Sequence, residues 1–131
     1  MSIEIGIKGR ADAVVTAENT AIAMGSGTVP VFATPCMAAL MEASAVNALA
    51  PCLGEGENTV GTRLDICHDD ATPVGLRVWA ECHLTELRGK VCVFDVFAYD
   101  ERGLIGKGIH ERCLVNEARF LAKVESKKER P

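Results

Sequence analysis

The chain has 131 residues, of which 48% are hydrophobic, yet only six are aromatic: four Phe, one Tyr and one Trp. Its net charge of −4 gives no basic surface for nucleic acid. No apolar run approaches the roughly 20 residues that cross a bilayer, and the first residues do not resemble a signal peptide. We therefore expect one domain over residues 1–131, located in the cytoplasm, with no membrane or nucleic-acid partner and a core of small side chains.

The cysteines follow neither a disulfide nor a metal-binding pattern. No two of them have the C-x-x-C spacing of structural zinc sites, and a disulfide framework belongs to secreted chains. We expect free, buried thiols in a reducing compartment, and neither a metal nor a cofactor. The six are Cys36, Cys52, Cys67, Cys82, Cys92 and Cys113.

Two short segments near the start of the chain have strand character, residues 3–7 and residues 12–18. Residues 25–30 contain two Gly, a Ser and a Pro and are typical of a loop. At the other end, residues 123–131 are densely charged, and we expect a solvated, frayed tail there.

Residues 35–50 are rich in Ala, Leu and Met and are predicted to form a helix. Thr34 is the expected N-cap, Pro35 suits the first helical position, and Pro51 ends the segment. Apolar side chains occupy nearly every face of this helix. We therefore expect it to be buried on all sides.

The second half of the chain alternates between apolar and polar residues with the period of a strand. Short turns separate four such segments, which predicts an antiparallel meander. One buried helix wrapped by a curved antiparallel sheet is an α+β fold. The four segments cover residues 62–68, 76–84, 91–99 and 104–115.

Glu42 is the one charged residue of the predicted helix. A carboxylate buried without a partner is costly, so Glu42 is either a general base or nucleophile in a site, or it lies on a solvent-facing edge. Thr34, besides capping, would lie where a helix N-terminus can stabilise an oxyanion. The two are about 12 Å apart along the helix. They can act together by flanking a substrate or by meeting across a two-fold dimer interface, which we favour.

The histidines are weaker candidates. His68 continues the face of Leu64 and Ile66 at a strand end, before two aspartates that would favour its protonated form or orient it as a base. His83 lies on a polar strand face. The run His110-Glu111-Arg112 is typical of a solvated strand stripe, although an arginine there could bind a phosphate or carboxylate.

Several segments together resemble the hotdog-fold thioesterases that include fluoroacetyl-CoA thioesterases, over roughly residues 20–125. The resemblance implies a hotdog fold, a dimer that binds acyl-CoA at its interface, and hydrolysis of the thioester. The segments are Val31-Phe32-Ala33-Thr34-Pro35, Leu40-Met41-Glu42, Gly61-Thr62, His68 with Ala71-Thr72-Pro73, and Gly108-Ile109-His110-Glu111-Arg112.

The resemblance also implies roles for individual residues. Thr34, Glu42 and His68 would be catalytic, while Gly61 and Arg112 would contact the substrate. Thiolate is a good leaving group, so this reaction needs no metal.

One departure bears on the substrate. Fluoroacetate-specific enzymes carry an aromatic residue shortly before the threonine, where this chain has Thr28-Val29-Pro30. We therefore expect a short-chain acyl-CoA substrate without specialisation for fluorine. Two alternatives stay open: a hotdog acyl-CoA hydratase and a non-catalytic acyl-CoA-binding module.

Overall fold

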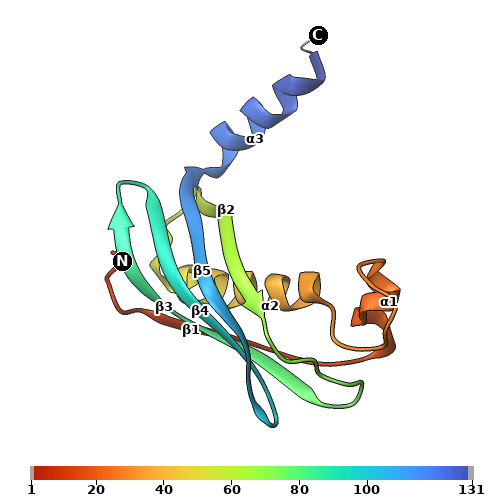
Figure 1. Cartoon of the computed structure of the whole chain (residues 1–131). Helices are drawn as coiled ribbons and strands as arrows, with labels where there is room; N and C mark the ends of the chain where they lie inside the picture. Colours follow the sequence, from red (N-terminus) through yellow and green to blue (C-terminus); the bar gives the residue numbers. More distant parts are fainter. Residues whose placement is uncertain (1, 130–131) are drawn as a thin grey trace.

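A five-stranded antiparallel sheet curves around one long helix in the computed structural model, which describes residues 2–129 (Figure 1). The helix, α2, spans Thr34–Leu49 and lies across the concave face of the sheet. The α+β architecture is therefore as the sequence predicts. The strands, in the order that they take across the sheet, are β1 (Lys8–Val14), β3 (Arg77–Arg88), β4 (Val91–Asp100), β5 (Gly103–Asn116) and β2 (Glu57–His68).

The predicted meander is correct for β3, β4 and β5 but wrong for β2. That strand pairs with β5 at the far edge of the sheet instead of with β3. The connection after it cannot close a hairpin because its backbone is bonded elsewhere: Asp69 N–H donates to the Ile105 carbonyl, and the Thr72 carbonyl accepts from Phe32. This topology aligns Gly61 with Arg112 in neighbouring strands.

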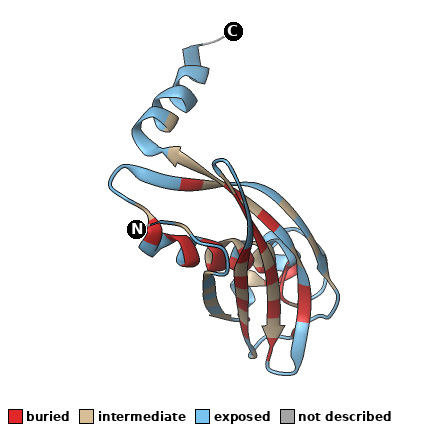
Figure 2. Ribbon diagram, turned by 90° about the vertical axis from the view of Figure 1, so that its left-hand side faces the viewer, coloured by how far each residue is buried: buried red, intermediate tan, exposed pale blue. Residues whose placement is uncertain are grey.

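The ends of the chain also differ from expectation. A single strand, β1, replaces the two predicted N-terminal segments, because it pairs along its whole length with β3. A short helix, α1 (Ala21–Met24), follows it. The predicted frayed tail is helical: α3 (Glu117–Glu125) and a 3-10 turn (Ser126–Glu129) project from the body and are mostly exposed (Figure 2), while residues 130–131 lie outside the described part. No helix among the described residues is long and apolar enough to cross a membrane.

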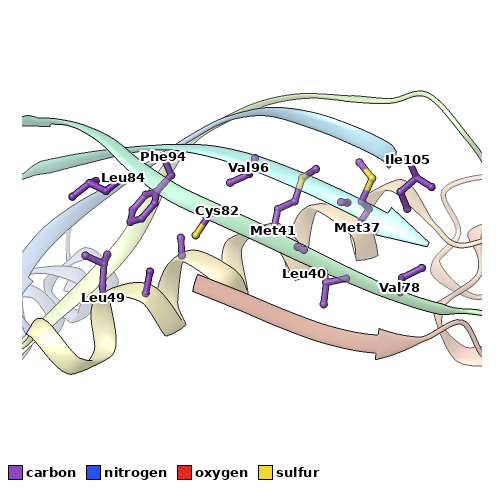
Figure 3. Close-up of a cluster of buried hydrophobic side chains, with 14 of the residues drawn as sticks. Met37, Leu40, Met41, Leu49, Val78, Cys82, Leu84, Phe94, Val96 and Ile105 are labelled. Atoms are coloured by element: carbon purple, nitrogen blue, oxygen red, sulfur yellow. The ribbon is translucent and has the colours of Figure 1, made fainter. Parts of the chain in front are cut away.

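The hydrophobic core lies between α2 and the concave face of the sheet (Figure 3). Glycines allow the close approach that a core poor in aromatic side chains needs. A Cβ at Gly106 would lie 2.8 Å from the Met37 Sδ, and one at Gly9 would collide with the Ser44 carbonyl. Helix and sheet are therefore in close contact at these two glycines. The largest fully buried apolar side chains are Phe94, Met37, Met41, Leu49, Leu84 and Ile105.

The prediction that α2 is buried on all sides is wrong. Pro35, Ala39 and Val46 are exposed, and the Glu42 side chain retains 42% of its accessible surface. These four positions are three or four residues apart and form one stripe along the helix, which we call the open stripe. The sheet covers only one side of α2, and none of residues 2–129 packs on the open stripe of a single chain.

All six cysteines are free, as expected. Three of them are buried, Cys52, Cys82 and Cys92, but Cys67 is exposed. Successive residues of a strand face opposite sides of the sheet. Cys67 therefore faces outward where the next residue, His68, faces the helix.

Candidate active site

The five predicted site residues fall into two groups along α2. Thr34 and His68 meet at the N-terminus of the helix. Glu42, Gly61 and Arg112 meet near its middle. Eight residues of helix separate the two groups, which is about 12 Å. The chain therefore brings the predicted residues together as two clusters, the Thr34–His68 pair and the Glu42 cluster, and not as one.

In the Thr34–His68 pair, the threonine Oγ1 lies 2.8 Å from the histidine Nδ1. The predicted N-cap is wrong by one residue, since Ala33 occupies that position and no side chain caps the helix. Thr34 is instead the first residue of α2. Its hydroxyl is therefore available to the imidazole that the end of β2 presents.

The first turn of α2 offers few free amides. Pro35 has no N–H, and the N–H groups of Cys36 and Met37 both donate to the Ala33 carbonyl at 3.0 Å. These two amides are therefore already bonded in this chain. The hydroxyl of Thr34 is the polar group that this end of the helix presents beside His68.

Burial governs the charge of His68. Its Nε2 is shielded from solvent and has no hydrogen-bond partner among the described residues. Desolvation lowers the pKa of His68, and it outweighs the backbone of Asp70 and the charges of Asp69 and Asp70, which raise it. Of the two effects that the sequence left open for the aspartates, the protonated form is not favoured. The ring is neutral at pH 7 and can accept a proton.

In the Glu42 cluster, the carboxylate Oε1 lies 3.6 Å from the Arg112 Nη1 and 3.9 Å from the His110 Nε2. The side chains of Arg112 and His110 are 8% and 1% exposed, against 42% for Glu42. Glu42 therefore lies on a solvent-facing edge of the helix, which is one of the two expected positions, and it also has buried partners. Its carboxylate links those partners to the open stripe.

β2 passes close to this carboxylate at Gly61. A Cβ there would lie 2.5 Å from the Glu42 Oε1 and 3.2 Å from the Arg112 Nη1. Any side chain would therefore displace the carboxylate from the guanidinium. The absence of a side chain at residue 61 is a requirement of the cluster.

The interpretation of residues 110–112 as a solvated stripe is wrong for two of the three. His110 and Arg112 are buried on the inner face of β5, and Glu111 points to the other face. The guanidinium Nε donates to the Thr59 Oγ1 at 3.0 Å, and Nη2 donates to the Thr59 carbonyl at 3.2 Å. Sequence reasoning missed Thr59 and the burial of His110. The hydrogen-bond partners of the His110 and Arg112 side chains on β2 lie about 50 positions away in the sequence, so no local pattern marks their burial.

His83 does not contribute to the site. It lies on the outer face of the sheet, stacked on Phe97 with ring centroids 6.1 Å apart, and its Nε2 is 3.6 Å from an Asp95 oxygen. A surface hollow of about 510 Å³ adjoins it there. This hollow is on the opposite side of the sheet from α2 and both clusters, so we do not assign the chemistry to it.

Known proteins resemble this chain over nearly its whole length. The family model described as fluoroacetyl-CoA-specific thioesterase matches residues 15–118. Fluoroacetyl-CoA thioesterase of Streptantibioticus cattleyicolor is 41% identical over 97 residues, which are 74% of this chain and 70% of that enzyme. A solved structure of the fluoroacetyl-CoA thioesterase has 34% identity and a TM-score of 0.91, covering 97% of this chain and 98% of the other.

A thioesterase superfamily member from Thermus thermophilus has 31% identity and a TM-score of 0.90, covering 98% of this chain and 95% of its own. The matched residues 15–118 include all five predicted site residues. The resemblance seen in the sequence and the hotdog fold that it implies are confirmed. The chain belongs to the fluoroacetyl-CoA-specific thioesterase family.

Proposed function

We propose that this chain hydrolyses short-chain acyl-CoA thioesters with Thr34, His68 and Glu42 as catalytic residues, and with Gly61 and Arg112 in contact with the substrate. The observation that carries the proposal is the 2.8 Å contact between a hydroxyl with no capping role and a neutral imidazole. Two structures of the related thioesterase support a two-carbon acyl group: a threonine-to-alanine variant holds fluoroacetate, and a threonine-to-serine variant holds acetyl-CoA.

The proposed site is shared between two copies of the chain. Residue 38 lies midway between Thr34 and Glu42, so a two-fold axis beside Ala38 would place Thr34 of one copy next to Glu42 of the other. Ala38 and Ala39 have small side chains, which let two antiparallel helices approach closely. The exposed apolar residues of the open stripe support such a partner, because a homodimer would cover them.

In the proposed reaction, an oxygen attacks the thioester carbonyl carbon, the carbon–sulfur bond breaks, and CoA leaves as a thiolate. Glu42 either attacks directly, after which water cleaves the resulting anhydride, or removes a proton from the attacking water. The Thr34 hydroxyl donates to the carbonyl oxygen as negative charge develops there. His68 carries the proton that the thiolate takes up. One water is consumed, and one acid and one thiol are formed.

The test compares Glu42→Gln with wild type, using acetyl-CoA and measuring the release of free thiol. We expect kcat to fall by about 10³-fold or more, because the amide is neither a base nor a nucleophile. Glu55→Gln, at an exposed turn outside both clusters, is the matched control and should keep full activity. Equal rates for Glu42→Gln and wild type would refute the proposal.

Two further measurements on the wild-type protein distinguish the two alternative functions. Hydration of crotonyl-CoA without release of thiol would indicate a hydratase. An acyl-CoA that raises the melting temperature but is never hydrolysed would indicate a binding module. Family membership favours the thioesterase over both.

We also propose a cytoplasmic location. Its support is the presence of six free thiols, which suits a reducing compartment. Fractionation of cells that express the chain, followed by measurement of thioesterase activity in each fraction, tests this location.

A further inference from the structure

His110 is a buried histidine that the proposed reaction does not use. Its Nδ1 lies 2.8 Å from the Arg63 carbonyl oxygen, and its Nε2 lies 3.1 Å from the Arg112 Nη1. A carbonyl oxygen can only accept a hydrogen bond, so Nδ1 carries the proton. A guanidinium can only donate, so Nε2 is unprotonated and accepts. Both neighbours therefore require the same neutral tautomer.

Arg112 is held from two sides. Thr59 accepts from Nε through its hydroxyl and from Nη2 through its carbonyl, while His110 accepts from Nη1. A planar guanidinium with three of its nitrogens bonded has a fixed orientation. In that orientation Nη1 also faces the Glu42 Oε1, at 3.6 Å.

We propose that His110 is a positioning residue for the site carboxylate: its Nε2 holds Arg112 so that Nη1 points at Glu42. With 1% of its side chain exposed, His110 acts through Arg112 and not on the substrate. The inference rests on the proposed function, in which Glu42 attacks the thioester or activates water. When a preoriented guanidinium already holds the carboxylate in place, the free-energy cost of bringing that carboxylate to its reactive position is smaller.

Protonation of His110 would break this arrangement, because an Nε2–H would then face an Arg112 N–H across 3.1 Å. Burial lowers the pKa of His110 most and Arg112 lowers it further, whereas the Arg63 carbonyl, Glu42 and Glu111 raise it. On β4, the residue paired with His110 is the apolar Phe94. The ring therefore stays neutral at pH 7, and activity should be lost in acid through His110 as well as through His68.

Two substitutions separate the two hydrogen bonds of His110. In His110→Gln the amide oxygen replaces Nε2 as acceptor for Arg112 and does not titrate. In His110→Asn the shorter amide can donate to the Arg63 carbonyl but does not reach Arg112. We expect kcat with acetyl-CoA to fall about 10- to 100-fold in His110→Asn. In His110→Gln, kcat should stay within about 3-fold of wild type, and the contribution of His110 to the acid limb of kcat/KM should disappear.

His83→Gln, on the outer face, is the matched control and should change neither kcat nor the pH profile. Equal losses of kcat in the Asn and Gln variants, or no loss in either, would overturn the proposal.

Nitrogen-15 NMR of the His110 imidazole gives a second test that does not depend on activity, and we expect the neutral tautomer with the proton on Nδ1. A proton on Nε2 at neutral pH would also overturn the proposal. If wild type hydrolyses no thioester, the proposed function fails, and the NMR result still decides the hydrogen bonding of His110.

Discussion

At the N-terminus of α2, Thr34 is exposed, and its hydroxyl forms a hydrogen bond with a half-buried imidazole. Near the middle of the same helix, Glu42 reaches two side chains that are almost fully buried, and α2, β2 and β5 all contribute to the cluster. The first cluster is a neutral pair that can pass a proton with little movement. The second is a charged group whose orientation is set by a scaffold. Proton transfer needs two groups within hydrogen-bond distance of each other, whereas stabilising a charge in a set orientation needs preorganised partners.

The largest expected effect comes from mixing two inactive variants, one with a defect in the Thr34–His68 pair and one with a defect in the Glu42 cluster. If one substrate uses Thr34 and His68 of one copy and Glu42 of the other, a dimer of Glu42→Gln with His68→Gln contains one intact site. Random assembly gives about half such mixed dimers, so the mixture should recover about a quarter of wild-type activity. Each variant alone should retain less than about 1%.

Refolding the two variants together and measuring thiol release from acetyl-CoA provides the comparison. Glu42→Gln mixed with Arg112→Lys is the matched control, because both defects lie in the Glu42 cluster and no site would be intact. A mixture of Glu42→Gln and His68→Gln that stays inactive would show that both clusters act within one copy.

A smaller effect separates catalysis from capping at Thr34. Thr34→Val removes the hydroxyl at nearly constant volume, and we expect kcat to fall about 10²-fold, as when one oxyanion donor is lost. Thr34→Ser keeps the hydroxyl and should stay within about 10-fold of wild type. Because Ala33 is the N-cap, Thr34→Val should change the free energy of unfolding by less than about 0.5 kcal/mol.

For Thr16→Val we expect the reverse of Thr34→Val, namely an effect on stability and none on kcat. The Thr16 hydroxyl accepts from the Glu18 N–H at 3.3 Å and caps the 3-10 turn there. Its loss should lower stability by up to about 1 kcal/mol and leave kcat unchanged. Urea unfolding and thiol release, measured on both variants, would contradict the assignment of Thr34 if its loss affected stability more than activity.

The sequence predicted the helix and most of the sheet because these depend on local signals. Composition and the end signals located the helix within one residue at its N-terminus, and a lone charge among apolar residues marked Glu42. It could not predict that the helix has an open side, because an apolar face is compatible with burial by the same chain or by a second copy. Which of the two buries the face depends on how much of the helix the strands of the same chain cover, and no local sequence pattern indicates that.

The same limit explains the errors at β2 and in β5. The connection after His68 looks like a turn, and only its long-range bonds to Ile105 and Phe32 carry β2 to the far edge. In β5, glycines interrupt the alternation before His110, so its burial is hard to read from the pattern. A polar residue becomes stable inside only through partners such as Thr59 and Arg63, which lie about 50 positions away in the sequence.

The smallest predicted effect concerns the free energy of unfolding in mild acid. Each of the two clusters contains a histidine that makes this free energy depend on pH. Burial lowers the pKa of His68 and of His110 in the folded chain from the ordinary value of 6.5. Below that value the unfolded chain binds protons that the folded chain does not. The free energy of unfolding is therefore at its full value above about pH 6.5 and falls as the pH drops toward the folded pKa values.

Thermal unfolding between pH 7 and pH 5 should show a decrease of a few degrees in Tm. The lowered pKa of Asp12 acts only near and below its ordinary value of 3.8, outside this range. His110→Gln should flatten the decrease more than His68→Gln does, because His110 is the more deeply buried of the two. A decrease of unchanged slope in His110→Gln would mean that the Glu42 cluster tolerates an imidazolium, and then Arg112 would not depend on a neutral acceptor for its orientation.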